Sequence, residues 1–285
     1  MDATAGPAPA RAAQGERHRL VYRHSVATRL THWIATLAFF VLVMSGLQIF
    51  NAAPYLDASD KSDPGRRVVD IGFTTNPSGN PAGYLRIFGF QIPTGHALGF
   101  TDDGLGSETG RAFPGWITLP GYQDLADGRR WHLFFAWIAV IAGLAYIVAG
   151  ARRRDLALIV LRPSDLPKLV PMQLYYLRLR REPPAYGKYN PLQKLAYTLV
   201  LFVFAPLVVL SGLALSPGID ALAGPLTTLL GGRQFARLWH FAAMVGLIGF
   251  FFVHVTLVLS TGVVNNLRSM ITGSYELGKH EGLGP

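Results

Sequence analysis

The sequence has no cysteine, and this absence excludes several kinds of site. Disulfides, cysteine-ligated iron–sulfur clusters, thiolate zinc sites and the C-x-x-C-H attachment of a c-type haem all need that residue. Charged residues are also scarce, at 15% of 285 residues against 50% hydrophobic ones. This balance is unusual for a soluble enzyme. Any redox cofactor must be held by other side chains, and eight histidines are available.

Four stretches lack nearly all charge and are long enough to cross the core of a bilayer, which takes about 20 helical residues. A surface helix of a soluble protein would show a polar stripe, and these stretches show almost none. The predicted spans are 33–50, 131–150, 195–215 and 238–262. The sequence therefore predicts an all-α membrane protein, with one domain (1–285) built as a bundle of four transmembrane helices.

The basic residues are unevenly distributed, and their distribution predicts an orientation. The net charge of +9 alone would suggest nucleic acid, but 151–194 carries ten Lys or Arg against three acidic residues, whereas 51–130 carries seven against nine. Cytoplasmic flanks of membrane proteins attract Lys and Arg. We therefore expect 151–194 and both tails, 1–28 and 263–285, in the cytoplasm, the long 51–130 loop outside, membrane lipid around the spans, and no nucleic-acid partner.

The two long connections have different compositions. The 51–130 loop is rich in Gly, Pro, Asp and Asn, yet it contains apolar pieces such as 84–90 and 113–118, and a purely disordered linker would have fewer of these. Loops of this length are often functional. A docking surface for an outer partner is the favoured interpretation, and a simple lid over the bundle stays open. In the other connection, 169–181 is predicted to be a short amphipathic helix at the membrane interface.

Four histidines lie within or at the edge of the spans, where an ionisable side chain is costly and is a candidate for function. His240 and His254 are 14 residues apart, so they share one helix face and are separated by about 21 Å along its axis. Because successive helices alternate in direction, His32 lies at the inner level with His254. His132 lies at the outer level with His240.

Two imidazoles facing each other from different helices suit a metal at the centre of a planar macrocycle, since helix bundles build such sites from facing side chains. Structural zinc would want four ligands. We therefore predict two b-type haems, one held by His32 and His254 and the other by His132 and His240, with electron transfer as their role because no axial position is left open. Arginines near each level are candidate partners of the anionic propionates; the three we select are Arg29 at the inner level and Arg130 and Arg237 at the outer level.

The first and third spans share a short pattern. Residues 41–47 and 206–213 each consist of an apolar run that is followed by Ser-Gly-Leu. An old duplication or a need for small residues at a helix contact would each explain it. Gly46 and Gly212 would also let a macrocycle approach the backbone.

These residues together resemble the bacterial cytochrome b561 family, which includes the membrane cytochrome b subunits of hydrogenases, formate dehydrogenase and thiosulfate reductase. The motifs that carry the resemblance are Arg-Leu-Thr-His-Trp at 29–33, Arg-Arg-Trp-His-Leu-Phe-Phe-Ala-Trp at 129–137, and the spacing of His240 and His254. The resemblance implies that the four histidines ligate two b haems in the bacterial inner membrane, in an electron-transfer subunit of an oxidoreductase complex.

The resemblance also implies partners on both sides of the membrane. Family members oxidise quinol or reduce quinone at one face and exchange electrons with a protein at the other. Residues 110–131 resemble members associated with periplasmic molybdopterin oxidoreductases, so such an enzyme is the implied periplasmic partner of the 51–130 loop. A quinone pocket near the inner level would use Arg29, Asn190, Lys194 or Tyr197. Two alternatives stay open: a proton-coupled transporter that uses the histidines, and a membrane anchor without a cofactor.

Overall fold

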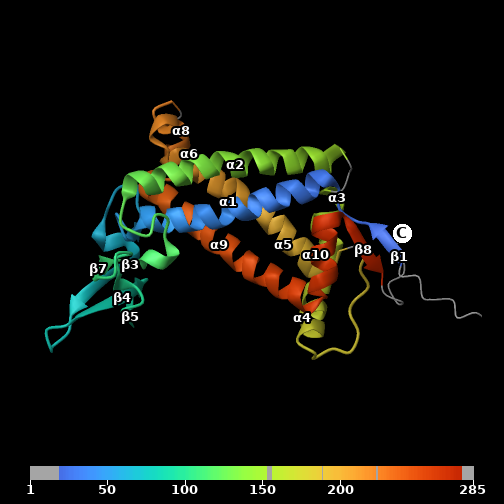
Figure 1. Cartoon of the computed structure of the whole chain (residues 1–285), viewed down its shortest axis with the longest axis horizontal. Coiled ribbons are helices and arrows are strands. Elements are labelled where there is room, and N and C mark those ends of the chain that lie inside the picture. The colour runs from blue at the N-terminus through green and yellow to red at the C-terminus, as the bar shows by residue number, and fades with distance from the viewer. Residues whose placement is uncertain (1–18, 153–155, 188, 223, 278–285) are drawn as a thin grey trace, which may run out of the picture.

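The computed structural model describes residues 19–152, 156–187, 189–222 and 224–277. Four helical stretches in these ranges are long and apolar enough to cross a membrane, and they form an elongated bundle (Figure 1). They are α1 (Val26–Phe50), α2 (Leu125–Arg152), the stretch Pro191–Leu215, and α9 (Arg233–Ser260). The four-helix bundle predicted from the sequence is therefore confirmed. The helices begin before the predicted spans because each continues into polar boundary residues.

The third span is divided by a change of helix type. It consists of α5 (Pro191–Leu199), a π-helical turn η4 (Val200–Phe204) and α6 (Ala205–Leu215). Pro206 lacks a backbone N–H, and a π turn just before it accommodates the interrupted hydrogen-bond ladder. The ring of Phe204 then lies so close to α9 that a Cβ on Gly246 would be 2.7 Å from it. The glycine is needed for that close approach.

The segment between α1 and α2 is a β module, so the expectation of an all-α fold is wrong for most of 51–130. Four antiparallel strands pair in the order β2-β3-β4-β5, and two more form a separate hairpin. The strands are β2 (Tyr55–Asp57), β3 (Arg67–Thr75), β4 (Pro81–Ile87), β5 (Phe90–Gly95), β6 (Gly99–Asp102) and β7 (Glu108–Arg111), with short 3-10 turns η1 (Pro64–Arg66) and η2 (Gly115–Ile117).

Local turn chemistry explains why this glycine-rich segment forms a sheet. Phe88 and Gly89 both have positive φ, 49° and 84°, in the two-residue turn that joins Ile87 to its partner Phe90. Positive φ at both central residues is the geometry of the hairpin turn whose twist matches that of antiparallel strands. Of the apolar pieces that suggested a lid or a docking surface, 84–90 forms the β4–β5 hairpin, whereas 113–118 surrounds the 3-10 turn η2.

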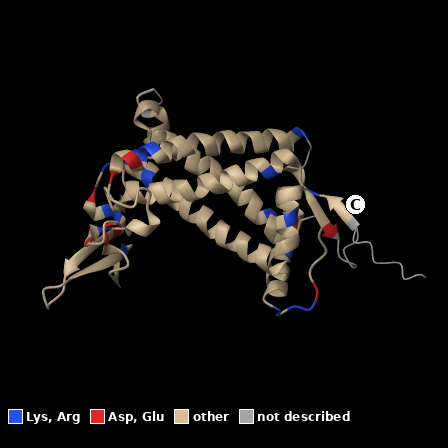
Figure 2. Cartoon of the chain, in the orientation of Figure 1, with Lys and Arg blue, Asp and Glu red and all other residues tan. Residues whose placement is uncertain are grey.

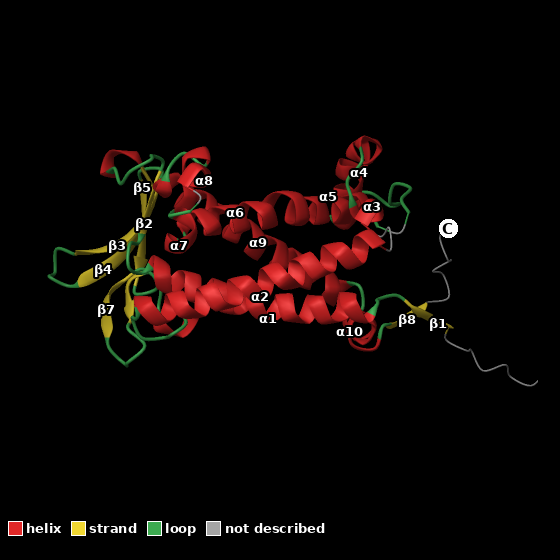
Figure 3. Ribbon diagram, turned by 90° about the horizontal axis from the view of Figure 1, so that it is seen from above, coloured by secondary structure: helices red, strands yellow, loops and turns green. Residues whose placement is uncertain are grey.

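The β module is joined to the bundle by an apolar core. Phe50 at the end of α1, Leu56 and Ile71 of the sheet, and Ala112 are buried together, with Phe241 of α9 packed against them. The rings of Phe50 and Phe241 have their centroids 5.0 Å apart. The module therefore covers one end of the bundle, which we call the β end (Figure 3).

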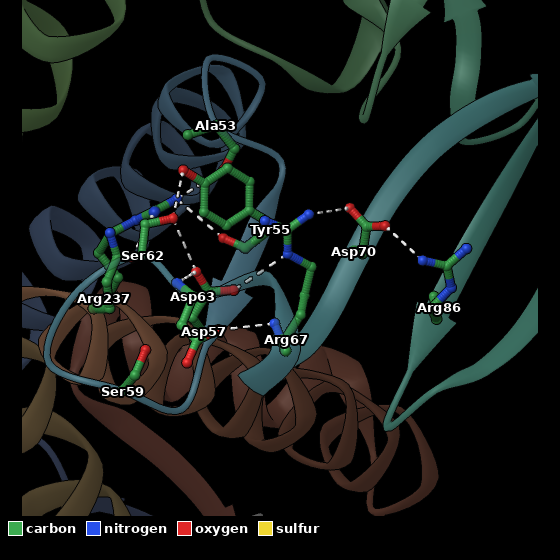
Figure 4. Close-up of polar contacts among 12 residues, drawn as sticks. Ala53, Tyr55, Asp57, Ser59, Ser62, Asp63, Arg67, Asp70, Arg86 and Arg237 are labelled. Carbon is green, nitrogen blue, oxygen red and sulfur yellow. Dashed lines mark hydrogen bonds and ion pairs between the residues drawn. The ribbon is translucent and has the colours of Figure 1, made fainter.

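A polar network adds to that junction (Figure 4). One guanidinium nitrogen of Arg237 in α9 donates to the carbonyls of Ala53 and Tyr55, at 2.7 and 3.1 Å. The carboxylate of Asp57 is fully buried and accepts from Arg67 and from Ser62, each at 3.2 Å. Because buried polar groups must be hydrogen-bonded to be tolerated, this network fixes the first strand of the module on α9.

The opposite end, which we call the terminal end, holds the two described ends of the chain. There β1 (Arg19–Tyr22) pairs antiparallel with β8 (Ser274–Leu277) beside α10 (Val263–Thr272). The basic connection folds over the same end as α3 (Leu156–Ile159), η3 (Pro163–Lys168) and α4 (Leu169–Tyr176), while α7 (Pro217–Asp220) and α8 (Gly224–Leu229) lie at the β end. Because α4 ends at Tyr176, the helix predicted at 169–181 is shorter than expected.

Charge is concentrated at the two ends of the bundle, and the middle of the helices is almost free of it (Figure 2). This is the pattern of helices that cross an apolar layer. The tail arginines and histidines in 1–18 and 278–285, and Arg153 and Arg154, lie outside the described residues.

Candidate haem-binding sites

The structure brings the four intramembrane histidines together as two pairs. His132 of α2 and His240 of α9 face each other near the β end, with ring centroids 6.0 Å apart. His32 of α1 and His254 of α9 face each other near the terminal end, with centroids 6.3 Å apart. These are the pairs expected from the alternating direction of the helices. In each pair two helices contribute one imidazole each, at one level of the bundle.

The β-end pair is held by two matching Ser-Gly sequences. The Oγ of Ser45 in α1 lies 3.1 Å from Nδ1 of His132, and the Oγ of Ser211 in α6 lies 3.1 Å from Nδ1 of His240. A Cβ on Gly46 would lie 3.3 Å from Cε1 of His132, and one on Gly212 would lie 3.2 Å from Cε1 of His240. The glycines therefore leave room for the two imidazole edges beside the helices.

The terminal-end pair has different surroundings. The ring of His254 stacks with that of Phe250, and His32 contacts Trp33 edge to face. Trp33 in turn donates from its indole nitrogen to the carbonyl of Met270 in α10, at 3.0 Å. Nδ1 of His32 is buried and has no hydrogen-bond partner among the residues described. Such an orphaned buried nitrogen is uncommon in folded proteins.

Both pairs have the dimensions of a bis-imidazole site. Two metal–nitrogen bonds of about 2 Å each, with the ring radii added, separate the centroids of two axial imidazoles by roughly 6 Å. In the described ranges no group of three or more His, Asp or Glu side chains gathers as a metal site. A pair of imidazoles on its own suits haem iron, whose other four ligands come from the macrocycle. The residues present therefore fit a haem at each level.

The three arginines expected beside the propionates differ in their hydrogen-bond partners. Arg29 of α1 donates to the carbonyl of Ile271, and its Nε is buried without a partner among the described residues. Arg130 forms an exposed ion pair with Asp127 at 2.9 Å. Arg237 is engaged with the β module, as described above. Of these three arginines, Arg29 is the one with a buried donor that has no partner among the described residues, and it lies three residues before His32.

The residues considered for a quinone pocket are partly committed to holding the terminal end together. Asn190 caps α5 and also donates to the hydroxyl of Tyr176, at 3.0 Å. The ammonium of Lys194 contacts both carboxylate oxygens of Asp165, at 3.0 and 3.2 Å. Tyr197 lies edge to face with Tyr189.

Sequence reasoning missed the roles of Ser45 and Ser211. The signal was present in the Ser-Gly-Leu pattern shared by the first and third spans. It was interpreted as a duplication or a packing requirement, because which histidine each serine meets depends on how the helices are rotated.

Comparison with known proteins identifies the family of the chain. A family described as prokaryotic cytochrome b561 matches residues 23–273. The chain is also 28% identical, over 256 residues, to a protein of Azospira oryzae named putative protein-methionine-sulfoxide reductase subunit YedZ1. That match covers 88% of this chain and 96% of the relative. With its four apolar helices, the chain is a membrane protein, and it is a member of the prokaryotic cytochrome b561 family, whose role is electron transfer through b-type haem.

Proposed function

We propose that the chain binds two b haems, with His32 and His254 as the axial ligands of one and His132 and His240 as those of the other. The observation that carries this proposal is the presence of two imidazole pairs, each with a centroid separation of 6.0 to 6.3 Å, on facing helices. The 14-residue spacing on α9 sets the two levels about 21 Å apart along the helix axis. Haem iron with two axial imidazoles supplies one-electron transfer and offers no open position for oxygen.

The protein would then conduct electrons between the quinone pool and a redox protein in the periplasm. The apolar helices hold the sites away from water, and the imidazoles orient the two macrocycles across the bundle. The excess of basic residues in 151–194 supports a cytoplasmic terminal end in the bacterial inner membrane. Arg29, with its buried free Nε, is the candidate partner for an anionic propionate or for quinone at that end.

The β module would face the periplasm and receive the partner. It covers the bundle end nearest His132 and His240, and it exposes large aromatic side chains, among them Phe88, Phe90 and Trp116, at 72, 79 and 76%. Exposed aromatic residues are enriched at protein interfaces. The relative's name places it in a reductase complex, and the likeness of residues 110–131 to partners of periplasmic molybdopterin oxidoreductases favours an enzyme of that class.

Two other functions are less well supported. A proton-coupled transporter would place ionisable residues along its path, but Asp, Glu and Lys in the four spans occur only at their ends. A membrane anchor without a cofactor would not need two imidazole pairs of one geometry.

The experiment is a reduced-minus-oxidised absorption spectrum of the detergent-purified protein, with haem quantified against protein. The proposal predicts a b-type spectrum and close to two haems per chain. Reduction by a quinol in the same preparation would support the quinone step. One haem per chain would contradict the assignment of both pairs, and a haem-free protein after expression with sufficient haem would contradict the proposed function as a whole.

A further inference from the structure

The two Ser-Gly sequences form matching contacts with the two histidines of the β-end pair. Ser45 and Gly46 lie on α1 and contact His132, while Ser211 and Gly212 lie on α6 and contact His240. The two Oγ–Nδ1 distances are both 3.1 Å, and the two Cβ–Cε1 distances, 3.3 and 3.2 Å, differ by only 0.1 Å. Two separate helix pairs therefore hold an imidazole in the same way, from opposite sides of one site.

In the serine–histidine hydrogen bonds, the donor can be identified by counting the protons of the serine hydroxyl. Each serine hydroxyl has one proton, and it is donated along the helix: Ser45 to the carbonyl of Val41 at 2.6 Å, and Ser211 to that of Leu207 at 2.5 Å. The oxygen is then free to accept from Nδ1–H of the histidine. Both serines are fully buried, so water does not compete for that contact.

This arrangement fixes the tautomer of both rings. With the proton on Nδ1, the lone pair is on Nε2, which is the nitrogen left free to bind a metal. A hydrogen bond from Nδ1–H also makes the imidazole a stronger electron donor and fixes the plane of the ring. The glycine beside each serine allows the ring edge to lie against the helix.

The terminal-end pair has no such arrangement among the described residues. Nδ1 of His32 is buried without a partner, and Trp33 and Phe250 provide ring contacts in place of hydroxyl oxygens. The two pairs therefore differ in the atoms that surround the imidazole rings. They do not differ in the type of ligand, since all four residues are histidines.

We propose that Ser45–Gly46 and Ser211–Gly212 are positioning residues that set the ring planes and the electron donation of the β-end ligands, and so lower the reduction potential of that site alone. The proposal rests on the proposed function, since it needs a haem at each level. Stronger donation from two imidazoles stabilises the ferric state, so loss of either hydroxyl should make that haem easier to reduce.

The test is a potentiometric titration of the purified holoprotein, followed by haem absorbance and by the ferric low-spin resonance spectrum. Wild type is compared with Ser45→Ala, Ser211→Ala and the double variant. Ser260→Ala is the matched control, because its hydroxyl also donates to a helix carbonyl, that of Leu257, at the far end of α9. Ser45→Thr and Ser211→Thr keep a hydroxyl and are the rescue variants.

We expect one of the two haems to become easier to reduce, by about threefold in the ratio of reduced to oxidised haem for each serine, which is roughly 30 mV for a one-electron couple. Its resonance spectrum should change as the ring planes are freed. The other haem and the Ser260→Ala control should stay at wild-type values. Loss of one haem in the alanine variants but not in the threonine variants would also support the role.

Equal shifts of both haems, unchanged potentials in all variants, or equal loss of haem in the alanine and threonine variants would overturn the inference. Failure of the proposed function is separable from these outcomes. A wild-type protein without two haems contradicts the function, whereas a wild-type protein with two haems and insensitive potentials contradicts only the role of the serines.

Discussion

The guanidinium of Arg111, at the end of β7, donates to the side-chain oxygen of Gln48 in α1 at 3.0 Å. The same guanidinium donates to the carbonyls of Asp103 and Gly121 at 2.9 Å and to the hydroxyl of Thr118 at 3.1 Å. Arg111 is only 2% exposed. One side chain thus ties the β6–β7 hairpin and the chain leading into α2 to the end of α1, next to the β-end histidine pair.

Arg111→Ala should therefore loosen the β module without removing the helices. Several buried acceptors would lose their donor, at a cost of about 1–3 kcal/mol for each group left unsatisfied. We expect a lower thermal midpoint and faster proteolysis between residues 99 and 121. Arg86→Ala is the control, since Arg86 lies on β4 of the four-stranded sheet and its side chain, which pairs with Asp70, is 40% exposed. Equal sensitivity of the two variants would contradict a special role for Arg111.

The contact between Asp165 and Lys194 predicts a pH dependence of stability at the terminal end. The backbone N–H of Arg162 and then the ammonium of Lys194 hold the pKa of Asp165 below its ordinary value. A carboxyl whose folded pKa is depressed stabilises the fold above its unfolded pKa of about 3.9, and this contribution disappears as the pH falls through the folded pKa.

Thermal midpoints measured between pH 7 and pH 3 in detergent should show this effect. The wild type should lose stability below about pH 4, and Asp165→Asn should be less stable at pH 7 and lose less on acidification. Glu108→Gln is the control, because Glu108 is half exposed in its pair with His96. If Asp165→Asn retained the full acid sensitivity of the wild type, other carboxyls would be responsible.

The helix bundle and the level of each histidine could be predicted from the sequence, because both follow from the length of apolar stretches and the spacing of residues. Apolar length predicts spans, and the 14-residue spacing on α9 with alternating helix directions predicts which histidines meet. The β module could not be predicted in the same way. Its strands are short and carry Gly83, Pro93 and Gly95. It also buries charged residues, such as Asp57 at 0% and Arg111 at 2% exposure, and composition alone does not indicate that burial.

The immediate surroundings of the imidazoles were also beyond the sequence. Which serine reaches which ring depends on helix rotation to within a fraction of a turn, and no periodicity argument has that resolution. The same holds for Arg237, whose position near the outer level suggested a propionate partner. In the structure its donors are directed to the backbone of Ala53 and Tyr55.

The two glycines beside the β-end imidazoles predict a site-specific steric effect. Gly46→Ala or Gly212→Ala would place a methyl group 3.3 or 3.2 Å from Cε1 of the ring, so the imidazole must move by a few tenths of an ångström. We expect an altered absorption or resonance spectrum of one haem, or its partial loss, in each variant. Gly249→Ala in α9 and Gly143→Ala in α2 are matched controls, since apart from the adjacent residues and the helix's own backbone no atom would lie within 4 Å of the added Cβ. A change of the same size in the controls would mean that helix packing, and not the ring, is responsible.

The assignment of the four histidines to two sites predicts which single substitutions behave alike. His132→Ala and His240→Ala should each remove the haem nearer the β end, because an iron left with one imidazole loses half of its protein ligands. His32→Ala and His254→Ala should each remove the other haem. Haem content per chain would fall from two to one in every variant, and the spectrum that remains would be the same within a pair and different between pairs. Combining two substitutions of one pair should leave one haem, whereas combining one from each pair should leave none. If His32→Ala and His240→Ala removed the same haem, the pairs seen in the structure would not be the ligand pairs.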